Sequence, residues 1–208
     1  MARLKTLLLA FLFLTGAWYL VGELIFAASR DRGELSTVEI TFRFSHVLFT
    51  LPLLLLPIVQ FSQGLRSRRP ALHRGLGRLY LVSAILASIG ALYLGLTFEE
   101  TGRRPPLVVF AALWLLFSLA AWICARRRAY AAHANFVLRS YGVALAFVLV
   151  RVLNGFESEL FGFIENDEVR NVTREWLAFV VPLVVIELGI SWLPALPRRK
   201  GASAPATP

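Results

Sequence analysis

The sequence predicts an all-α protein, a bundle of six transmembrane helices that forms a single domain. Of the 208 residues, 57% are hydrophobic, and the mean hydropathy is +0.65, which lies outside the usual range of soluble domains. The chain also contains six apolar runs that approach the roughly 20 residues a helix needs to cross a bilayer. The net charge of +9 comes largely from arginines between these runs, which is the pattern of the positive-inside rule.

The expected spans are residues 6–28, 43–63, 77–97, 107–125, 134–152 and 175–195. The first run is longer than the roughly 7–15 apolar residues of a signal peptide, so we expect a retained helix. The second carries Pro52 and Pro57, which predict a bend. The sixth has Trp176 and Trp192 near its two ends, which is typical of interfacial aromatic belts.

One domain, residues 1–196, contains all six spans, and residues 40–155 are its expected core. Spans two and three should form one hairpin and spans four and five a second, similar one. The remaining residues, 197–208, are rich in proline, alanine and charge, and predict a disordered tail.

The distribution of basic residues predicts the orientation. Thirteen arginines and lysines lie on the side of the N-terminus, the tail and the loops after spans two and four, against seven on the other side. Cytoplasmic loops carry the excess of basic residues. We therefore expect a bacterial cytoplasmic (inner) membrane protein with both termini and both basic loops in the cytoplasm.

Two basic stretches resemble each other. Residues 66–80 read RSRRPALHRGLGRLY, and residues 126–142 read RRRAYAAHANFVLRSYG. Each places an arginine cluster before a histidine, His73 or His133, and an Arg-x-Tyr after it. Such a pair of histidines at the starts of two helices could supply both axial ligands of a haem b, with Arg78 and Arg139 at the propionates. Equally, the histidines could lie at headgroup level and bind loop backbone.

A second candidate site is an ion pair between Arg139 and Glu187. An ionisable group inside a bilayer is costly unless it is paired or hydrated. At 1.5 Å per residue, the two side chains lie at similar depths in spans five and six. An outer group near the opposite helix ends comprises Glu23, Arg43, His46 and Arg151, which snorkelling would largely satisfy.

The composition and motifs exclude several classes of function. The basic loops are explained by membrane topology rather than by nucleic acid, and arginine clusters beside a membrane attract anionic lipid headgroups. Cys124 is the single cysteine, so the chain has neither an internal disulfide nor a thiolate metal site. We find no glycine-rich phosphate loop, metalloprotease helix or nucleophile triad, so no catalytic residue is assigned.

The residues His73-Arg74-Gly75-Leu76-Gly77-Arg78-Leu79-Tyr80, followed by the stretch from Ala132 to Tyr141, resemble an uncharacterised bacterial family of predicted multi-pass membrane proteins. The resemblance covers about residues 40–155 and implies a helical membrane bundle without an assigned activity, so it carries over no catalytic residues. A looser similarity links the bundle to transmembrane b-type cytochromes, although three histidines are one fewer than a two-haem member needs.

Three functions therefore remain open, and the sequence leaves undecided whether the protein is an enzyme. The first is a non-catalytic membrane protein that binds lipid or scaffolds a partner. The second is a redox protein with haem b on His73 and His133. The third is a transporter of a small solute or protons that uses Glu187 and Arg139. No other cofactor is indicated, and the oligomeric state is not predicted.

Overall fold

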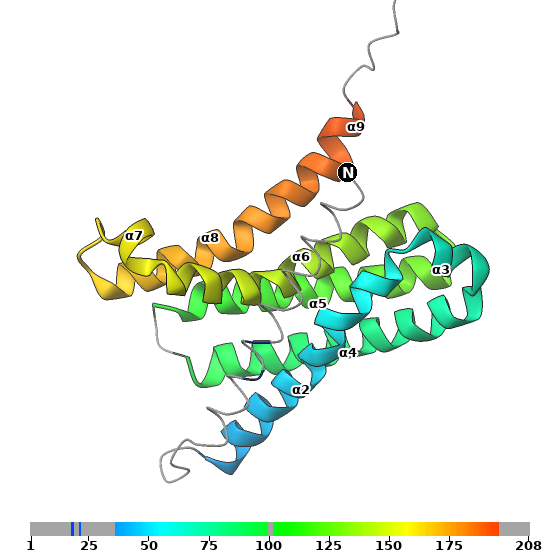
Figure 1. The fold of residues 1–208 in the computed structure, drawn as a ribbon. Coiled ribbons are helices and arrows are strands. Elements are labelled where there is room, and N and C mark those ends of the chain that lie inside the picture. The colour runs from blue at the N-terminus through cyan, green and yellow to red at the C-terminus, as the bar shows by residue number, and fades with distance from the viewer. Residues whose placement is uncertain (1–17, 19–20, 22–35, 100–101, 196–208) are drawn as a thin grey trace, which may run out of the picture.

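The computed structural model describes residues 36–99 and 102–195, together with Trp18 and Val21, and these residues fold as helices without a strand (Figure 1). In chain order the elements are α2 (Thr37–Gln60), α3 (Gln63–Arg68), α4 (Pro70–Thr97), α5 (Arg104–Arg126), α6 (Tyr130–Gly155), α7 (Glu157–Phe161), α8 (Asp167–Glu187), the π-helical turn η1 (Leu188–Trp192) and α9 (Leu193–Ala195). The predicted all-α class is confirmed.

Four helical stretches in the described residues are long and apolar enough to cross a membrane. They are α4, α5, α6 and the continuous stretch from Asp167 to Ala195. The expected second span corresponds to α2, whose 24 residues extend about 36 Å. The expected first span, residues 6–28, lies outside the described residues apart from Trp18 and Val21. The predicted number of six spans is therefore not confirmed.

All five helices that match an expected span begin earlier than their apolar runs predicted, which corrects the expected boundaries. Helix α2 begins at Thr37 rather than 43, and α5 at Arg104 rather than 107. Helix α4 begins at Pro70 rather than 77, α6 at Tyr130 rather than 134, and α8 at Asp167 rather than 175. Hydropathy indicates the part of a helix that lipid can surround. The polar residues of a first turn also adopt helical backbone, so a helix can begin before its apolar run. Proline is also favoured in the first helical turn, where no hydrogen-bond donor is lost.

The basic stretch 66–80 is accordingly not a loop. It contains the end of α3 and the first turns of α4, so His73, Arg74 and Arg78 all lie on a helix. The second basic loop shortens to residues 127–129 between α5 and α6. Similarly, Asn166 caps α8 by accepting a hydrogen bond from the backbone N–H of Val169 at 3.0 Å.

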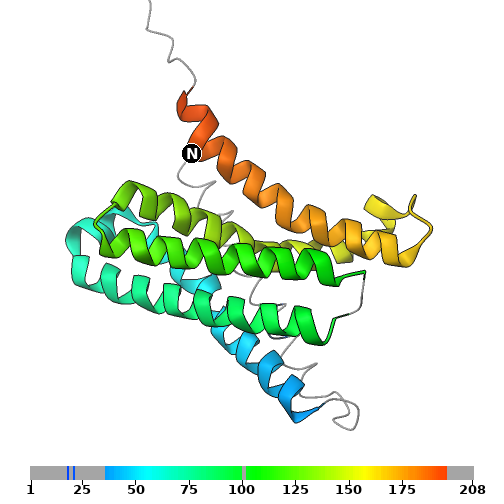
Figure 2. The ribbon, with the colours of Figure 1, turned by 180° about the vertical axis from the view of Figure 1, so that it is seen from behind.

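The helices pack in chain order: α2 lies against α4, α4 against α5, α5 against α6 and α6 against α8. Figure 2 shows α4, α5 and α6 side by side from behind, with α8 crossing obliquely. Small residues bring neighbouring helices close together. At Gly142 of α6, for example, an added Cβ would overlap Cδ1 of Ile186 on α8.

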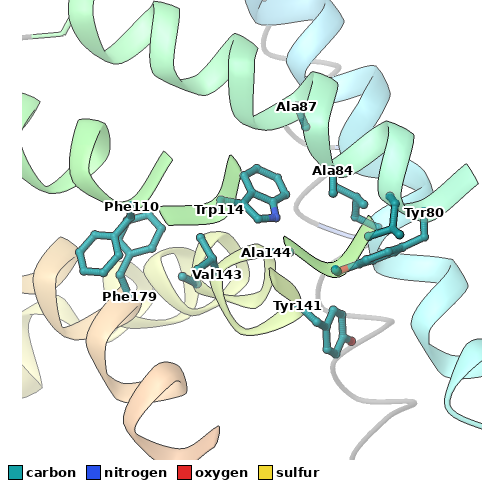
Figure 3. Close-up of a cluster of buried hydrophobic side chains, with 13 residues drawn as sticks. Tyr80, Ala84, Ala87, Phe110, Trp114, Tyr141, Val143, Ala144 and Phe179 are labelled. Carbon is teal, nitrogen blue, oxygen red and sulfur yellow. The ribbon is translucent and has the colours of Figure 1, made fainter. Parts of the chain in front are cut away.

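The buried core lies between α4, α5, α6 and α8, with Leu53 added from α2 (Figure 3). Trp114 of α5 is fully buried and lies at its centre. Towards the side of α7 and the start of α8, Phe110 stacks on Phe179 with 4.5 Å between the ring centres. Towards the other end, Tyr80 and Tyr141 are buried. The core thus reaches into α8, beyond the residues expected to form it.

Candidate functional site

One end of the bundle carries unpaired positive charge, and we call it the basic end. It is formed by α3, the start of α4 and the turn between α5 and α6 (Figure 1). Its exposed arginines are Arg66, Arg68, Arg69, Arg74, Arg78, Arg126, Arg127 and Arg128. The ion pairs of the described residues involve other arginines, namely Arg43, Arg103, Arg139, Arg170 and Arg174. The sequence has no acid between Ile40 and Phe98, which explains why this end stays positive.

The turn between α5 and α6 holds an arginine in an unusual backbone conformation. Arg128 has a φ of 60°, in the left-handed region, and is the second residue after the end of α5. The backbone N–H of Ala129 reaches back to the carbonyl of Cys124 at 2.9 Å. Glycine is the usual residue at such a helix end, because it lacks the Cβ that makes this conformation unfavourable. An arginine is therefore present at some cost in stability.

His73 and His133 both lie at the basic end, on the first turns of α4 and α6. Nδ1 of His133 lies 2.9 Å from the carbonyl oxygen of Ala121 on α5. Nδ1 of His73 is buried without a hydrogen-bond partner. The two sequence-predicted histidines thus lie at the same end of the bundle, on two different helices.

The two arginines expected to act alike have different surroundings. Arg78 is exposed on α4 at the basic end. Arg139 of α6 instead forms an ion pair with Glu187, the last residue of α8, through both of its carboxylate oxygens. The Arg139 Nη2 to Glu187 Oε2 distance is 3.1 Å. Arg139 is thereby committed to a carboxylate partner within the chain.

Glu187 has a second partner at the π-helical turn η1. The hydroxyl of Ser191 donates to Oε2 of Glu187 at 3.0 Å. The guanidinium carbon of Arg139 also lies 5.4 Å from the ring centre of Phe136. Turns of this kind are rare and are frequently found at functional sites. The turn adds a polar contact to the pair in a segment that is otherwise apolar.

A chain of buried hydroxyl groups crosses the core, and sequence reasoning missed it. Ser118 Oγ lies 2.9 Å from Ser140 Oγ and donates to the carbonyl of Trp114 at 2.8 Å. Tyr80 Oη lies 3.5 Å from Ser140 Oγ. These groups connect α4, α5 and α6. The available signal was the repeated Arg-x-Tyr motif, whose two tyrosines are both buried.

His46 points into the bundle instead of snorkelling to the interface. Its Nδ1 lies 2.8 Å from the carbonyl oxygen of Ala87 on α4. Its ring meets those of Trp114 and Phe147 edge-on, at 6.4 and 5.6 Å between ring centres. Gly90 of α4 faces it, and an added Cβ there would make an ordinary van der Waals contact with Cβ of His46 at 3.5 Å. His46 thus joins α2 to α4.

The opposite end of the bundle carries paired charges, and we call it the ion-pair end. Arg103 binds Glu175 at 2.7 Å and Glu99 at 3.7 Å. The other pairs are Arg43 with Glu39 and Glu99, Arg170 with Glu157 and Asp167, and Arg174 with Glu157. Of these residues, sequence reasoning singled out Arg43 as a site candidate. Glu175 could have been noticed, because it shares the helical stripe of Ala178 and Phe179.

The donor groups limit what the structure could bind. Within residues 36–99 and 102–195, no three histidine, cysteine, aspartate or glutamate side chains are placed to hold a metal ion. Cys124 is half-buried and is not part of a disulfide. Charge is concentrated instead at the two ends of the bundle, unpaired at one and paired at the other.

Long apolar helices, a core that extends between them and charges at both ends define a multi-pass helical membrane protein. The chain belongs to the family described as Predicted membrane protein (DUF2306), whose model matches residues 43–190. This confirms the family resemblance of the two basic motifs and extends it through α8. No curated protein and no solved structure matches the chain.

Proposed function

We propose that the protein is a non-catalytic, multi-pass protein of the bacterial cytoplasmic membrane that binds anionic phospholipid headgroups at its basic end. The observation that carries the proposal is the contrast between the two ends. Eight exposed arginines at the basic end have no carboxylate partner among the described residues, whereas Arg43, Arg103, Arg170 and Arg174 at the other end are paired. Unpaired arginines beside a membrane attract anionic lipids.

The orientation that accompanies this proposal places the basic end in the cytoplasm. The thirteen-to-seven distribution of basic residues supports it. A topology reporter fused after Arg69, active only outside the cytoplasm, should be silent. Activity of that fusion would contradict the orientation, and a fusion after Phe163 at the other end is the positive control.

The strained conformation of Arg128 adds support. A left-handed non-glycine residue costs about 1–2 kcal/mol, and glycine would remove that cost. The retention of an arginine fits a role for its charge, because strained residues often serve function rather than stability. A phosphate group on the lipid would accept hydrogen bonds from such guanidinium groups.

The lipid proposal is tested by native mass spectrometry of the detergent-purified protein. Phosphatidylglycerol should be retained in preference to phosphatidylcholine with the same acyl chains. The variant Arg66→Gln, Arg68→Gln, Arg69→Gln should lose that preference by about a hundredfold, since each basic residue contributes about 1 kcal/mol. Equal retention of the two lipids by the native protein would refute the proposal.

The matched control removes the same charge from the other side. The variant Arg30→Gln, Arg32→Gln, Arg104→Gln also lacks three arginines, all of which the sequence assigns to the opposite side. It should keep the preference for phosphatidylglycerol. A similar loss in both triple variants would mean that overall charge, and not the basic end, attracts the lipid.

A second candidate function is a haem b redox protein, for which His73 and His133 lie on the first turns of α4 and α6 at the same end of the bundle. With Nδ1 of His133 at a backbone carbonyl, its Nε2 is free to bind a ligand. Of the two arginines expected at the propionates, Arg78 is exposed and Arg139 is held by Glu187. A reduced-minus-oxidised difference spectrum should show a sharp α band that His73→Ala and His133→Ala each abolish and His46→Ala retains. A colourless protein made with ample haem excludes this candidate.

A further inference from the structure

Glu175 is a carboxylate on the face of α8 that is otherwise occupied by apolar core residues. It lies on α8 three and four residues before Ala178 and Phe179, so the three share one face. All three are buried, and Glu175 is 1% exposed. Phe179 in turn stacks on Phe110. The carboxylate therefore adjoins the aromatic part of the core and not open solvent.

The two oxygens of Glu175 are not equivalent. Oε1 accepts a hydrogen bond from Nε of Arg103 at 2.7 Å. Oε2 is buried and has no hydrogen-bond partner. A buried carboxylate needs partners for both oxygens to retain a full charge at low cost. The side chain thus has one oxygen arranged for an ion pair and one that a proton could occupy.

The charged groups that face Glu175 come from three places. Arg103 precedes α5, Glu99 lies in the connection between α4 and α5, and Arg174 is its neighbour on α8. Arg103 also interacts with Glu99, and Arg174 with Glu157 of α7. Both guanidinium groups are therefore shared with another carboxylate, so neither neutralises Glu175 alone.

We propose that Glu175 is a proton-binding site that is reached from the ion-pair end. A hydronium ion at that end transfers a proton to Oε2 of the carboxylate, which gives the neutral acid and a water molecule, and Oε1 remains the acceptor for Arg103. The reverse step returns the proton to the same water. Carboxylates buried in membrane proteins serve as proton-carrying groups. The site lies at the opposite end from the lipid-binding arginines and is independent of them.

Infrared spectroscopy of the full-length protein in lipid nanodiscs tests the proposal. The carbonyl stretching band of a protonated carboxyl group should rise as the pH is lowered, and Glu175→Gln should remove one carboxyl per chain from it. The control Glu159→Gln changes an exposed carboxylate at the same end that is not among the charged groups facing Glu175. It should leave the Glu175 band in place. Identical titrations of the native protein and Glu175→Gln would overturn the proposal.

Two further measurements make the outcome decisive. Arg103→Gln removes the cation beside Oε1, so the band should persist to more alkaline pH. A band that titrates as in the native protein would show that Arg103 does not control the site. Titrations in sodium and choline chloride should coincide. A midpoint that moves with sodium would mean that Oε2 binds a metal cation instead of a proton. Glu175→Gln should keep the native melting profile, because the amide oxygen can still accept from Arg103.

Discussion

Arg139 of α6 and Glu187 of α8 form a two-point ion pair between these two helices. The pair holds the end of α8 against α6 at the level where the regular α-helix gives way to the π-helical turn. Without it, Ser191 would be the remaining polar partner of the carboxylate. Measuring how much this ion pair contributes to the free energy of unfolding therefore tests whether it holds α8 against α6.

Removing one partner of this pair should cost more than removing both. Arg139→Ala leaves a carboxylate without its cation, at a cost of about 3 kcal/mol in an apolar environment. The double variant Arg139→Ala, Glu187→Ala should recover much of that loss. Thermal unfolding in detergent measures both. A double variant that melts no higher than Arg139→Ala would show that the pair contributes nothing, and Glu187 would then be better explained as a proton-carrying or hydrogen-bonding group.

Enlarging Gly142 should separate α6 from α8. Gly142→Leu places carbon atoms where the Cδ1 of Ile186 lies, and overpacking of this kind costs about 1–3 kcal/mol. The additional change Ile186→Ala creates space and should restore part of the stability. Melting temperatures of the single and double variants provide the comparison. If Ile186→Ala lowers the melting temperature further in the Gly142→Leu background, the proposed close contact is wrong.

Arg128→Gly should stabilise the protein while weakening its preference for anionic lipid. The change relieves the left-handed conformation, and the net gain is about 0.5–1 kcal/mol after the added freedom of glycine in the unfolded chain. The neighbouring Arg127 has a φ of −83°, so Arg127→Gly should destabilise by a similar amount. Unfolding and lipid retention are measured on both. Equal effects of the two glycines on stability would contradict the structural explanation.

The buried hydroxyls of Ser118 and Ser140 should be energetically coupled. Ser140→Ala leaves the Ser118 hydroxyl with the Trp114 carbonyl and removes the group that Tyr80 approaches, at a cost of about 1–2 kcal/mol. Ser118→Ala should cost about as much. The double variant should cost less than the two single costs together, as a double-mutant cycle measures. Strict additivity would show that the two hydroxyls do not interact.

The sequence predicted the apolar part of the fold better than its helix starts. For α5 the expected 107–125 differs little from Arg104–Arg126, because charged residues end the apolar run on both sides. For α4 the error was seven residues, since His73 and Arg74 are polar but lie on helical backbone. Helical periodicity and hydropathy do not indicate at which polar residue a loop ends and the next helix begins.

The sequence likewise predicted some contacts of the candidate sites and not others. The pairing of Arg139 with Glu187 could be proposed from the sequence, because the depth of each residue can be counted from the end of its span. In the structure the two side chains are in contact. The contact between Arg103 and Glu175 could not be anticipated. It joins a residue before α5 to one on α8, and it depends on how far each helix extends and which face it turns inward. The inward turn of His46 depends on the same information.

The order of packing has a consequence for how the protein forms. Because each helix lies against the one before or after it in the chain, most of the bundle can assemble during synthesis, as each hairpin leaves the ribosome. The contacts of α8 are the exception, since Glu175 must reach back 72 residues to Arg103 and Glu187 must reach back 48 to Arg139. Helix α8 is thus attached through arginines that are synthesised well before it. A ribosome-stalled chain that ends before residue 167 would therefore contain Arg103 and Arg139 without Glu175 and Glu187.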